Sequence, residues 1–182
     1  MEPLTRPRVA TVWLGGCSGC HMSLLDMDER LLDLAGQMDL VYSPLMDIKE
    51  FPDDVDIALV EGAVSNADHV EMLRRVRERS AVLVAFGDCA VTGNVTALRN
   101  PLGSPQALLE RSYGTDADRR PGASGYGSVV PALTDRASTL RALVRVDYYL
   151  PGCPPPADLI HFVLTELIAG RTLDLRSRAK LG

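Results

Sequence analysis

Short apolar runs alternate with longer segments of mixed polarity along most of this chain. The apolar runs are rich in aliphatic residues and predict five strands, at residues 9–14, 39–43, 56–60, 81–86 and 145–150. The first run is apolar on both faces, as expected of a strand that is buried inside a parallel sheet. Strands that alternate with helices in this way predict a doubly wound α/β domain.

The segments between these runs have the apolar spacing of amphipathic helices. Helices are predicted at residues 22–35, 66–80, 136–143 and 156–169, with a short helix from about residue 90. In the first helix, five leucines form an apolar stripe: Leu24, Leu25, Leu31, Leu32 and Leu34. Asn66 and Asp135 are candidate N-caps, and Gly170 suits the end of the last helix.

Residues 100–135 interrupt this pattern with four prolines and frequent glycine and serine, and they predict a long irregular loop with one or two helical turns. Residues 171–182 predict a polar C-terminal tail. Long loops of this kind are often functional, so we expect both segments to contribute docking surface. The length of 182 residues and the absence of an internal repeat predict a single domain, residues 1–182.

Composition and charge narrow the class of protein. A hydrophobic content of 46% allows a sizeable core, and a net charge of −5 gives no indication of nucleic-acid binding. No apolar run approaches the roughly 18 residues that span a membrane, and residues 1–7 have neither an apolar signal core nor an Arg-Arg export motif. We therefore expect a cytoplasmic protein, whose cysteines act as metal ligands or redox groups rather than in disulfides.

All four cysteines lie just beyond predicted strands. Cys17 and Cys20 follow the first strand, Cys89 follows the fourth, and Cys153 follows the fifth. Because the carboxyl ends of parallel strands meet at one edge of a sheet, we expect these thiols to converge there. Four thiolates are the usual ligands of an iron–sulfur cluster, so the sequence predicts one [4Fe-4S] cluster. Neighbouring glycines allow backbone N–H groups to approach the sulfur atoms: Gly15, Gly16, Gly19, Gly87 and Gly152.

Other functions of the thiols stay open at this point. A single Cys-x-x-Cys pair is shared by clusters, zinc sites and thioredoxin-like redox pairs. A zinc site with four cysteines usually has two compact pairs, and Cys89 and Cys153 form no second pair. A dithiol enzyme leaves these two residues unexplained, whereas Cys89 alone is also compatible with a buried core thiol.

Several polar residues border the expected site. Glu61 follows a buried strand at the same edge, where a carboxylate suits a proton relay, a partner contact or a hydrogen bond to loop N–H groups. His21 follows Cys20 at a helix start, and we expect it to be exposed or at an interface. Asp88 is a candidate helix cap, and we expect Trp13 in the core or at an interface.

Four motifs resemble, in their order, those of the small subunits of [NiFe] hydrogenases. They are Cys17-Ser18-Gly19-Cys20, Val60-Glu61-Gly62, Gly87-Asp88-Cys89-Ala90 and Pro151-Gly152-Cys153-Pro154-Pro155. The sequences of residues 19–26 and 87–94 are most similar to those of the soluble, NAD-reducing (Hox-type) branch. At Asn94, the more widespread form of the motif has glycine instead. The resemblance implies a flavodoxin-like fold, with helices on both faces of the sheet and a proximal [4Fe-4S] cluster at the strand ends, held by Cys17, Cys20, Cys89 and Cys153.

The same resemblance implies an electron-transfer subunit of an H2:NAD+ oxidoreductase. Its partners would be a large subunit with the Ni–Fe centre and diaphorase subunits with FMN and iron–sulfur clusters. This chain lacks the two further cysteine pairs that a Ni–Fe centre needs, so no catalytic residue is expected on it, apart from Glu61 as a possible proton relay. With four cysteines, the chain completes one cubane.

Three alternatives are weighed against this resemblance. The related subunit of respiratory complex I typically uses adjacent cysteines at its first ligand pair, unlike Cys17 and Cys20. A flavodoxin-like FMN-binding protein would have a Ser/Thr-rich phosphate loop after the first strand, where this chain has glycines and cysteines, so FMN is not favoured. A zinc-stabilised scaffold is the third alternative.

Overall fold

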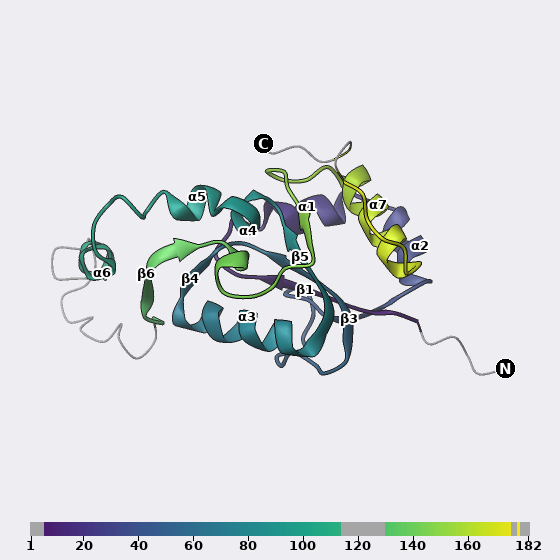
Figure 1. Ribbon diagram of the computed structural model, residues 1–182, viewed down its shortest axis with the longest axis horizontal. Helices are drawn as coiled ribbons and strands as arrows, with labels where there is room; N and C mark the ends of the chain where they lie inside the picture. Colours follow the sequence, from purple (N-terminus) through teal and green to yellow (C-terminus); the bar gives the residue numbers. More distant parts are fainter. Residues whose placement is uncertain (1–5, 114–129, 176–177, 179–182) are drawn as a thin grey trace.

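A five-stranded, entirely parallel sheet forms the centre of the computed structural model, which describes residues 6–113, 130–175 and 178 (Figure 1). The order β2-β1-β3-β5-β7 is the flavodoxin-like, doubly wound order. The strands are β1 (Arg8–Trp13), β2 (Asp39–Tyr42), β3 (Val55–Glu61), β5 (Ser80–Phe86) and β7 (Tyr148–Leu150). The predicted fold class is therefore confirmed.

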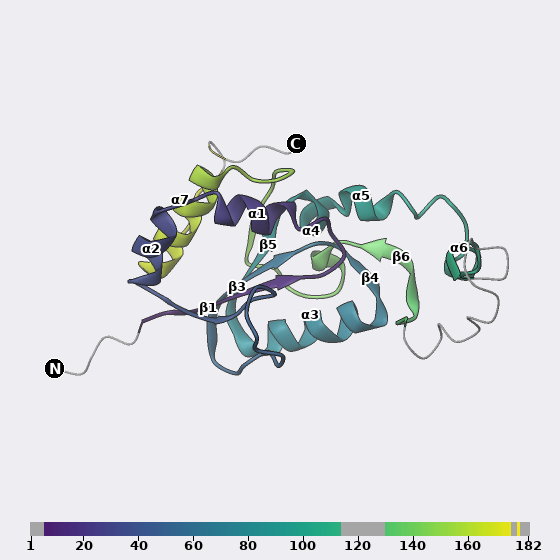
Figure 2. The same cartoon turned by 180° about the vertical axis from the view of Figure 1, so that it is seen from behind.

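Helices cover both faces of this sheet (Figures 1 and 2). One face carries α1 (Gly19–Leu25), α2 (Arg30–Ala35) and α7 (Ala157–Ile168), and the other carries α3 (Ala67–Arg79) and the short 3-10 helix η2 (Leu140–Ala142). Successive side chains of a strand point to opposite faces. In β3, Ile57 and Leu59 therefore pack with the first set of helices, and Ala58 and Val60 pack with the second.

The remaining elements lie beyond the carboxyl ends of the parallel strands. Two short helices follow β5: α4 (Asp88–Thr92) and α5 (Asn94–Ala97). A second, antiparallel sheet pairs β4 (Val64–Asn66) with β6 (Leu133–Ser138), and α6 (Pro105–Tyr113) contacts β6. Asn66 is the N-cap of α3, as predicted, because its side-chain oxygen accepts a hydrogen bond from the His69 N–H at 2.8 Å.

The predicted helix at residues 22–35 is wrong in its continuity. The chain forms α1 and α2 instead, and Asp28 between them has a φ of +51°. The predicted apolar stripe is right for Leu24, Leu31 and Leu34, which pack in the core, and wrong for Leu25 and Leu32, which are exposed. Leu34 is buried, whereas Leu32 is 74% exposed.

The predicted helix at residues 136–143 is wrong over its first half, whereas the 3-10 helix η2 lies within its second half. Residues up to Ser138 belong to β6 because β4 supplies a pairing partner, with Val64 opposite Ser138. Asp135 consequently lies in a strand and caps no helix there. The expected irregular loop at residues 100–135 contains α6 and the start of β6, while residues 114–129 lie outside the described part of the chain.

The expected polar tail is described only in part. Residues 171–175 have no regular secondary structure, residue 178 lies in a turn, and the other tail residues lie outside the described ranges. The single-domain organisation stays a prediction. Within the described ranges, every helix is too short or too polar to cross a bilayer.

Candidate metal centre

Four neighbouring strands place the predicted site residues at one edge of the sheet. Cys17 lies in the loop after β1, and Cys20 lies at the start of α1. β3 ends at Glu61, Cys89 lies at the start of α4 after β5, and Cys153 lies in the loop after β7. Because β1, β3, β5 and β7 are successive neighbours in the sheet, their loops lie side by side. The structure thus brings the four cysteine positions to a common edge, as expected from the sequence.

Hydrogen bonds join the loop of Cys89 to the loop after β7. The Asp88 N–H donates to the Gly152 carbonyl at 2.9 Å, and the Gly152 N–H donates to Asp88 Oδ1 at 2.7 Å. Ser23 of α1 donates its hydroxyl to the Pro155 carbonyl at 2.6 Å. Asp88 is the first residue of α4, so the cap position expected for it belongs to Gly87.

The first loop is fixed to the β3 end by backbone pairing. Gly15 and Ala63 exchange two N–H to carbonyl hydrogen bonds, at 2.9 and 2.8 Å. The Thr96 hydroxyl donates to the Gly15 carbonyl at 2.6 Å, which ties α5 to the same loop. A Cβ at Gly15 would lie 2.8 Å from the Ala63 oxygen, so only glycine permits this close approach.

The four thiols are free and form two pairs by exposure. Cys20 and Cys89, the inner pair, are 7% and 8% exposed, whereas Cys17 and Cys153, the outer pair, are exposed. Gly87 borders the inner pair with a φ of +83°, and a Cβ there would lie 2.1 Å from Cys20 Sγ. Glycine is therefore required at this position by both the backbone conformation and the space available.

Burial raises the pKa of the Cys20 thiol, and the nearby Glu61 carboxylate and the other three cysteines raise it further. Burial also raises the pKa of Cys89, although the backbone N–H groups of Val95 and Thr96 partly oppose this rise. These mutual effects show that the four thiols are close together. Because four free thiolates would repel one another, the arrangement favours ionised sulfur only beside cations, such as the irons of a cluster.

His21 is buried, which corrects the expectation that it is exposed or at an interface. Its side chain is 3% exposed, and Glu61 Oε2 accepts hydrogen bonds from its backbone N–H at 3.0 Å and from its ring Nδ1 at 2.5 Å. The ring also lies 6.1 Å from that of Phe86, measured between centroids. Glu61 therefore makes the hydrogen bond to a loop N–H that was one of its predicted roles. The sequence feature that could have indicated the burial of His21 is Glu61, because a buried carboxylate needs a hydrogen-bond partner.

Two observations fit a sulfur-ligated cluster better than a single ion. Among the described residues, His21 Nε2 is buried without a hydrogen-bond partner, and the four cysteines are free thiols, with Cys20 Sγ directly beside Gly87. Within the described ranges, no three His, Cys, Asp or Glu side chains are grouped around a position for one ion. A cubane divides its four cysteine ligands among four irons, so its ligands need not surround one point.

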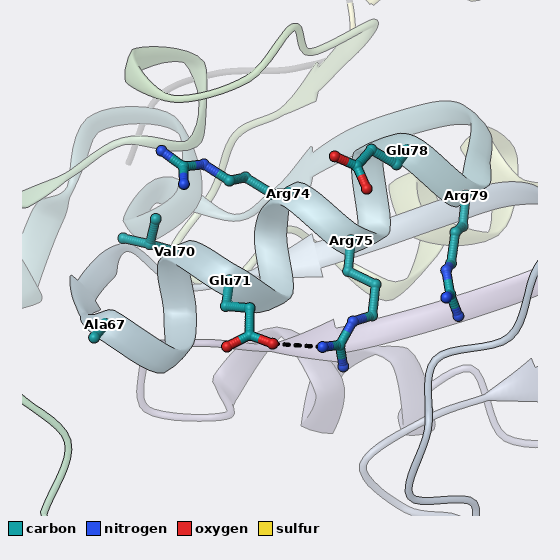
Figure 3. Close-up of a pocket in the computed structure, with 7 residues that line it drawn as sticks. All are labelled: Ala67, Val70, Glu71, Arg74, Arg75, Glu78 and Arg79. Carbon is teal, nitrogen blue, oxygen red and sulfur yellow. Dashed lines mark hydrogen bonds and ion pairs between the residues drawn. The ribbon is translucent and has the colours of Figure 1, made fainter.

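Trp13 and the outer face of α3 lie outside this centre. Trp13 is 46% exposed, so its expected place in the core is wrong and the interface alternative remains. A shallow hollow on α3 is lined mainly by charged side chains, including the ion pair of Glu71 and Arg75 at 2.5 Å (Figure 3). No cysteine lines that hollow, and we assign it no ligand.

Comparisons with known proteins agree with this geometry. Residues 17–167 match the family described as NADH ubiquinone oxidoreductase, 20 Kd subunit. The chain is 42% identical over 173 residues to the NAD-reducing hydrogenase HoxS subunit delta of Cupriavidus necator, covering 93% of this chain and 82% of that one. It is 27% identical over 185 residues to the iron-sulfur subunit of an F420-non-reducing hydrogenase from Archaeoglobus profundus, of whose length it spans 56%.

A solved structure is similar over nearly the whole chain. It is a chain of an NAD+-reducing [NiFe]-hydrogenase in the H2-reduced state, with a TM-score of 0.87, 41% sequence identity, and coverage of 96% of this chain and 98% of that one. The chain therefore belongs to the family of NADH:ubiquinone oxidoreductase 20 kDa subunits and, within it, to the small subunits of NAD-reducing [NiFe] hydrogenases. It is part of an enzyme complex.

Proposed function

We propose that this chain is the electron-transfer small subunit of its hydrogenase, and that Cys17, Cys20, Cys89 and Cys153 hold one proximal [4Fe-4S] cluster. When bound, such a cluster supplies one-electron transfer. The observation that carries the proposal is the convergence of four free thiols at one sheet edge, where Gly87 leaves space beside Cys20 Sγ. The name of the Archaeoglobus relative, an iron-sulfur subunit, supports the same cofactor class.

The inner and outer cysteines have different tasks in this proposal. Cys20 and Cys89 hold the buried side of the site, where Phe86 excludes water from the sheet end. Cys17 and Cys153 lie at the surface, where a partner subunit completes the burial. A low-dielectric surrounding of this kind, together with N–H donors near the sulfur atoms, sets the reduction potential of iron–sulfur sites.

We infer the partners from the hydrogenase relatives. The Ni–Fe centre lies on a large subunit, where hydrogen is split or made, and this chain relays single electrons between that centre and an NAD-reducing diaphorase with FMN and iron–sulfur clusters. A cytoplasmic location is proposed because all four cysteines are free thiols. The region at residues 100–135 stays our candidate docking surface. A complex that assembles and remains active without residues 104–128 would exclude it.

Glu61 stays a candidate proton relay, since it is a buried carboxylate beside the site. Glu61→Gln keeps the shape of the side chain and removes its ability to accept a proton. If H2-dependent NAD+ reduction by the complex is unchanged in this variant, Glu61 is no relay.

Anaerobic iron and sulfide analysis of the purified complex tests the cofactor. Cys89→Ala is expected to remove about four irons and four sulfides relative to the unmodified complex, together with one EPR signal of the reduced protein. An unchanged iron content in this variant would overturn the proposal. Absorption of the chain separates the alternatives: a broad brown band that bleaches with dithionite indicates a cluster, resolved flavin peaks indicate FMN, and a colourless protein indicates zinc.

A further inference from the structure

Asn94 connects the segment after Cys89 to Cys153. It lies at the start of α5 with a φ of +28°, in the range of positive φ where residues with side chains are uncommon. Its side-chain Nδ2 donates a hydrogen bond to Cys153 Sγ at 3.4 Å. Asn94 therefore combines an uncommon backbone conformation with a side-chain hydrogen bond to a cysteine of a different loop.

A hydrogen bond to a ligating sulfur changes the balance between the two redox states of a cluster. A cluster held by these cysteines would gain one electron on reduction. The added negative charge spreads onto the sulfur ligands, so an N–H donor stabilises the reduced state more than the oxidised state and raises the potential.

The donor to Cys153 differs in kind from those near Cys89. The groups near Cys89 are the backbone N–H groups of Val95 and Thr96, which a substitution leaves in place. The donor from Asn94 is a side-chain amide on an outer, exposed cysteine. Hydrogen bonding to this ligand therefore depends on the identity of a single side chain.

We propose that Asn94 is a positioning residue that raises the reduction potential of the cluster through its hydrogen bond to Cys153. This inference rests on the proposed function, because it requires Cys153 to be a cluster ligand. It concerns the potential alone, and the ligand set is complete without Asn94.

The test is an EPR-monitored redox titration of the purified hydrogenase complex with dithionite as reductant. The signal of this cluster is first assigned by its loss in Cys89→Ala. Asn94→Gly removes the donor and tolerates the positive φ, so the midpoint potential is expected to shift to a lower value. Asn94→Asp keeps the shape but replaces the donor by a carboxylate, so its downward shift is expected to be larger. Leu98→Ala, an exposed position one turn away, is the matched control and is expected to leave the midpoint unchanged.

Two results would overturn the inference. One is a midpoint potential in Asn94→Gly or Asn94→Asp that equals the unmodified value while the iron content is retained. The other is loss of the cluster in both variants, which would make Asn94 a determinant of cluster retention. If the Cys89→Ala complex has the same EPR signals and iron content as the unmodified complex, the proposed function is disproved instead. The two failures are therefore distinguishable.

Discussion

The two ends of the parallel sheet use polar residues in opposite ways. At the amino end, side chains of opposite charge pair across neighbouring elements, as in Arg77 with Asp147 at 2.5 Å and Arg79 with Asp53 at 3.0 Å. At the carboxyl end, four cysteines are brought together as free thiols, and the ring Nε2 of the buried His21 has no partner.

The amino end forms its ion pairs within the chain, whereas the carboxyl end leaves its thiols available for a cofactor. The amino end neutralises its charges within the chain, so substitutions there are expected to change the stability of the fold only. The carboxyl end has side-chain contacts too, such as His21 with Glu61, but its four thiols do not bond to one another. Substitutions of these cysteines are therefore expected to change the cofactor content first. The predictions below test this separation.

The largest expected effect is loss of the cofactor on substitution of an inner cysteine. In the proposed site, Cys20→Ala removes a ligand from a buried position that added thiols do not reach, so most of the iron bound by this chain should be lost. Cys153→Ala removes an exposed ligand, and an added small thiol should restore much of the iron. Iron and sulfide analysis with and without mercaptoethanol measures the contrast. Equal rescue of both variants would contradict the distinction between inner and outer pairs.

The next effect comes from filling the space beside Cys20. Gly87→Ala places a Cβ 2.1 Å from Cys20 Sγ, and most of the cofactor should be lost as the sulfur is displaced. Gly103→Ala is the matched control, because Gly103 also has a positive φ, of +112°, but a Cβ there would have no atom of the described residues within 4 Å. Both variants should lose about 1 kcal/mol of stability from backbone strain. Equal iron contents in the two variants would show that the space beside Cys20 has no role.

Removing His21 is expected to lower stability substantially. His21→Ala leaves the buried Glu61 carboxylate without its ring partner, which should reduce the free energy of unfolding by about 3 kcal/mol. Arg75→Ala breaks the surface ion pair with Glu71 and should cost only about 0.5 kcal/mol. Urea denaturation measures both changes. Similar losses in the two variants would mean that the burial of the first pair has no energetic consequence.

An effect smaller than that of His21→Ala is expected at the amino end and depends on pH. Although burial acts in the opposite direction, the Leu83 N–H and the Arg77 guanidinium hold the pKa of Asp147 below its usual 3.8. The carboxylate therefore stabilises the fold above about pH 4, and this contribution disappears as the pH falls through the lowered pKa. Asp147→Asn should reduce stability by about 1 kcal/mol at pH 7.

The two proteins should approach equal stability in strong acid, as urea denaturation at several pH values would show. The iron content of the complex should be unchanged by Asp147→Asn. The substitution lies at the opposite end of the sheet from the cysteines. A loss of iron in this variant would therefore contradict the expectation that the amino end affects only the stability of the fold.

The sequence predicted the central sheet because each buried parallel strand is a short apolar run of its own. The expected meeting of Cys17 and Cys153 then followed from strand direction alone. The burial of His21 was not predicted because its partner, Glu61, lies 40 residues further along the chain. The pairing of Val64 with Ser138 was missed for the same reason, since contacts between distant segments leave no periodic pattern in either segment.

The break between α1 and α2 has a different cause. Leucines continue on both sides of it, so their spacing indicated one helix. Asp28 adopts a positive φ instead, and the second helix buries Leu34 in the core beside Met27. Tertiary packing, rather than local preference, decides this break.

The position of β7 determines when the site is assembled during protein synthesis. β7 is the last strand of the described residues and forms one edge of the sheet, and the loop after it contains Cys153. A nascent chain on the ribosome exposes three of the four thiols well before the fourth has been translated. Asp88, which accepts a hydrogen bond from the Gly152 N–H, and Ser23, which donates one to the Pro155 carbonyl, also lack these partners until that loop is translated. In the proposed site, the full set of cysteine ligands is available to iron and sulfide only after almost the entire polypeptide has been translated.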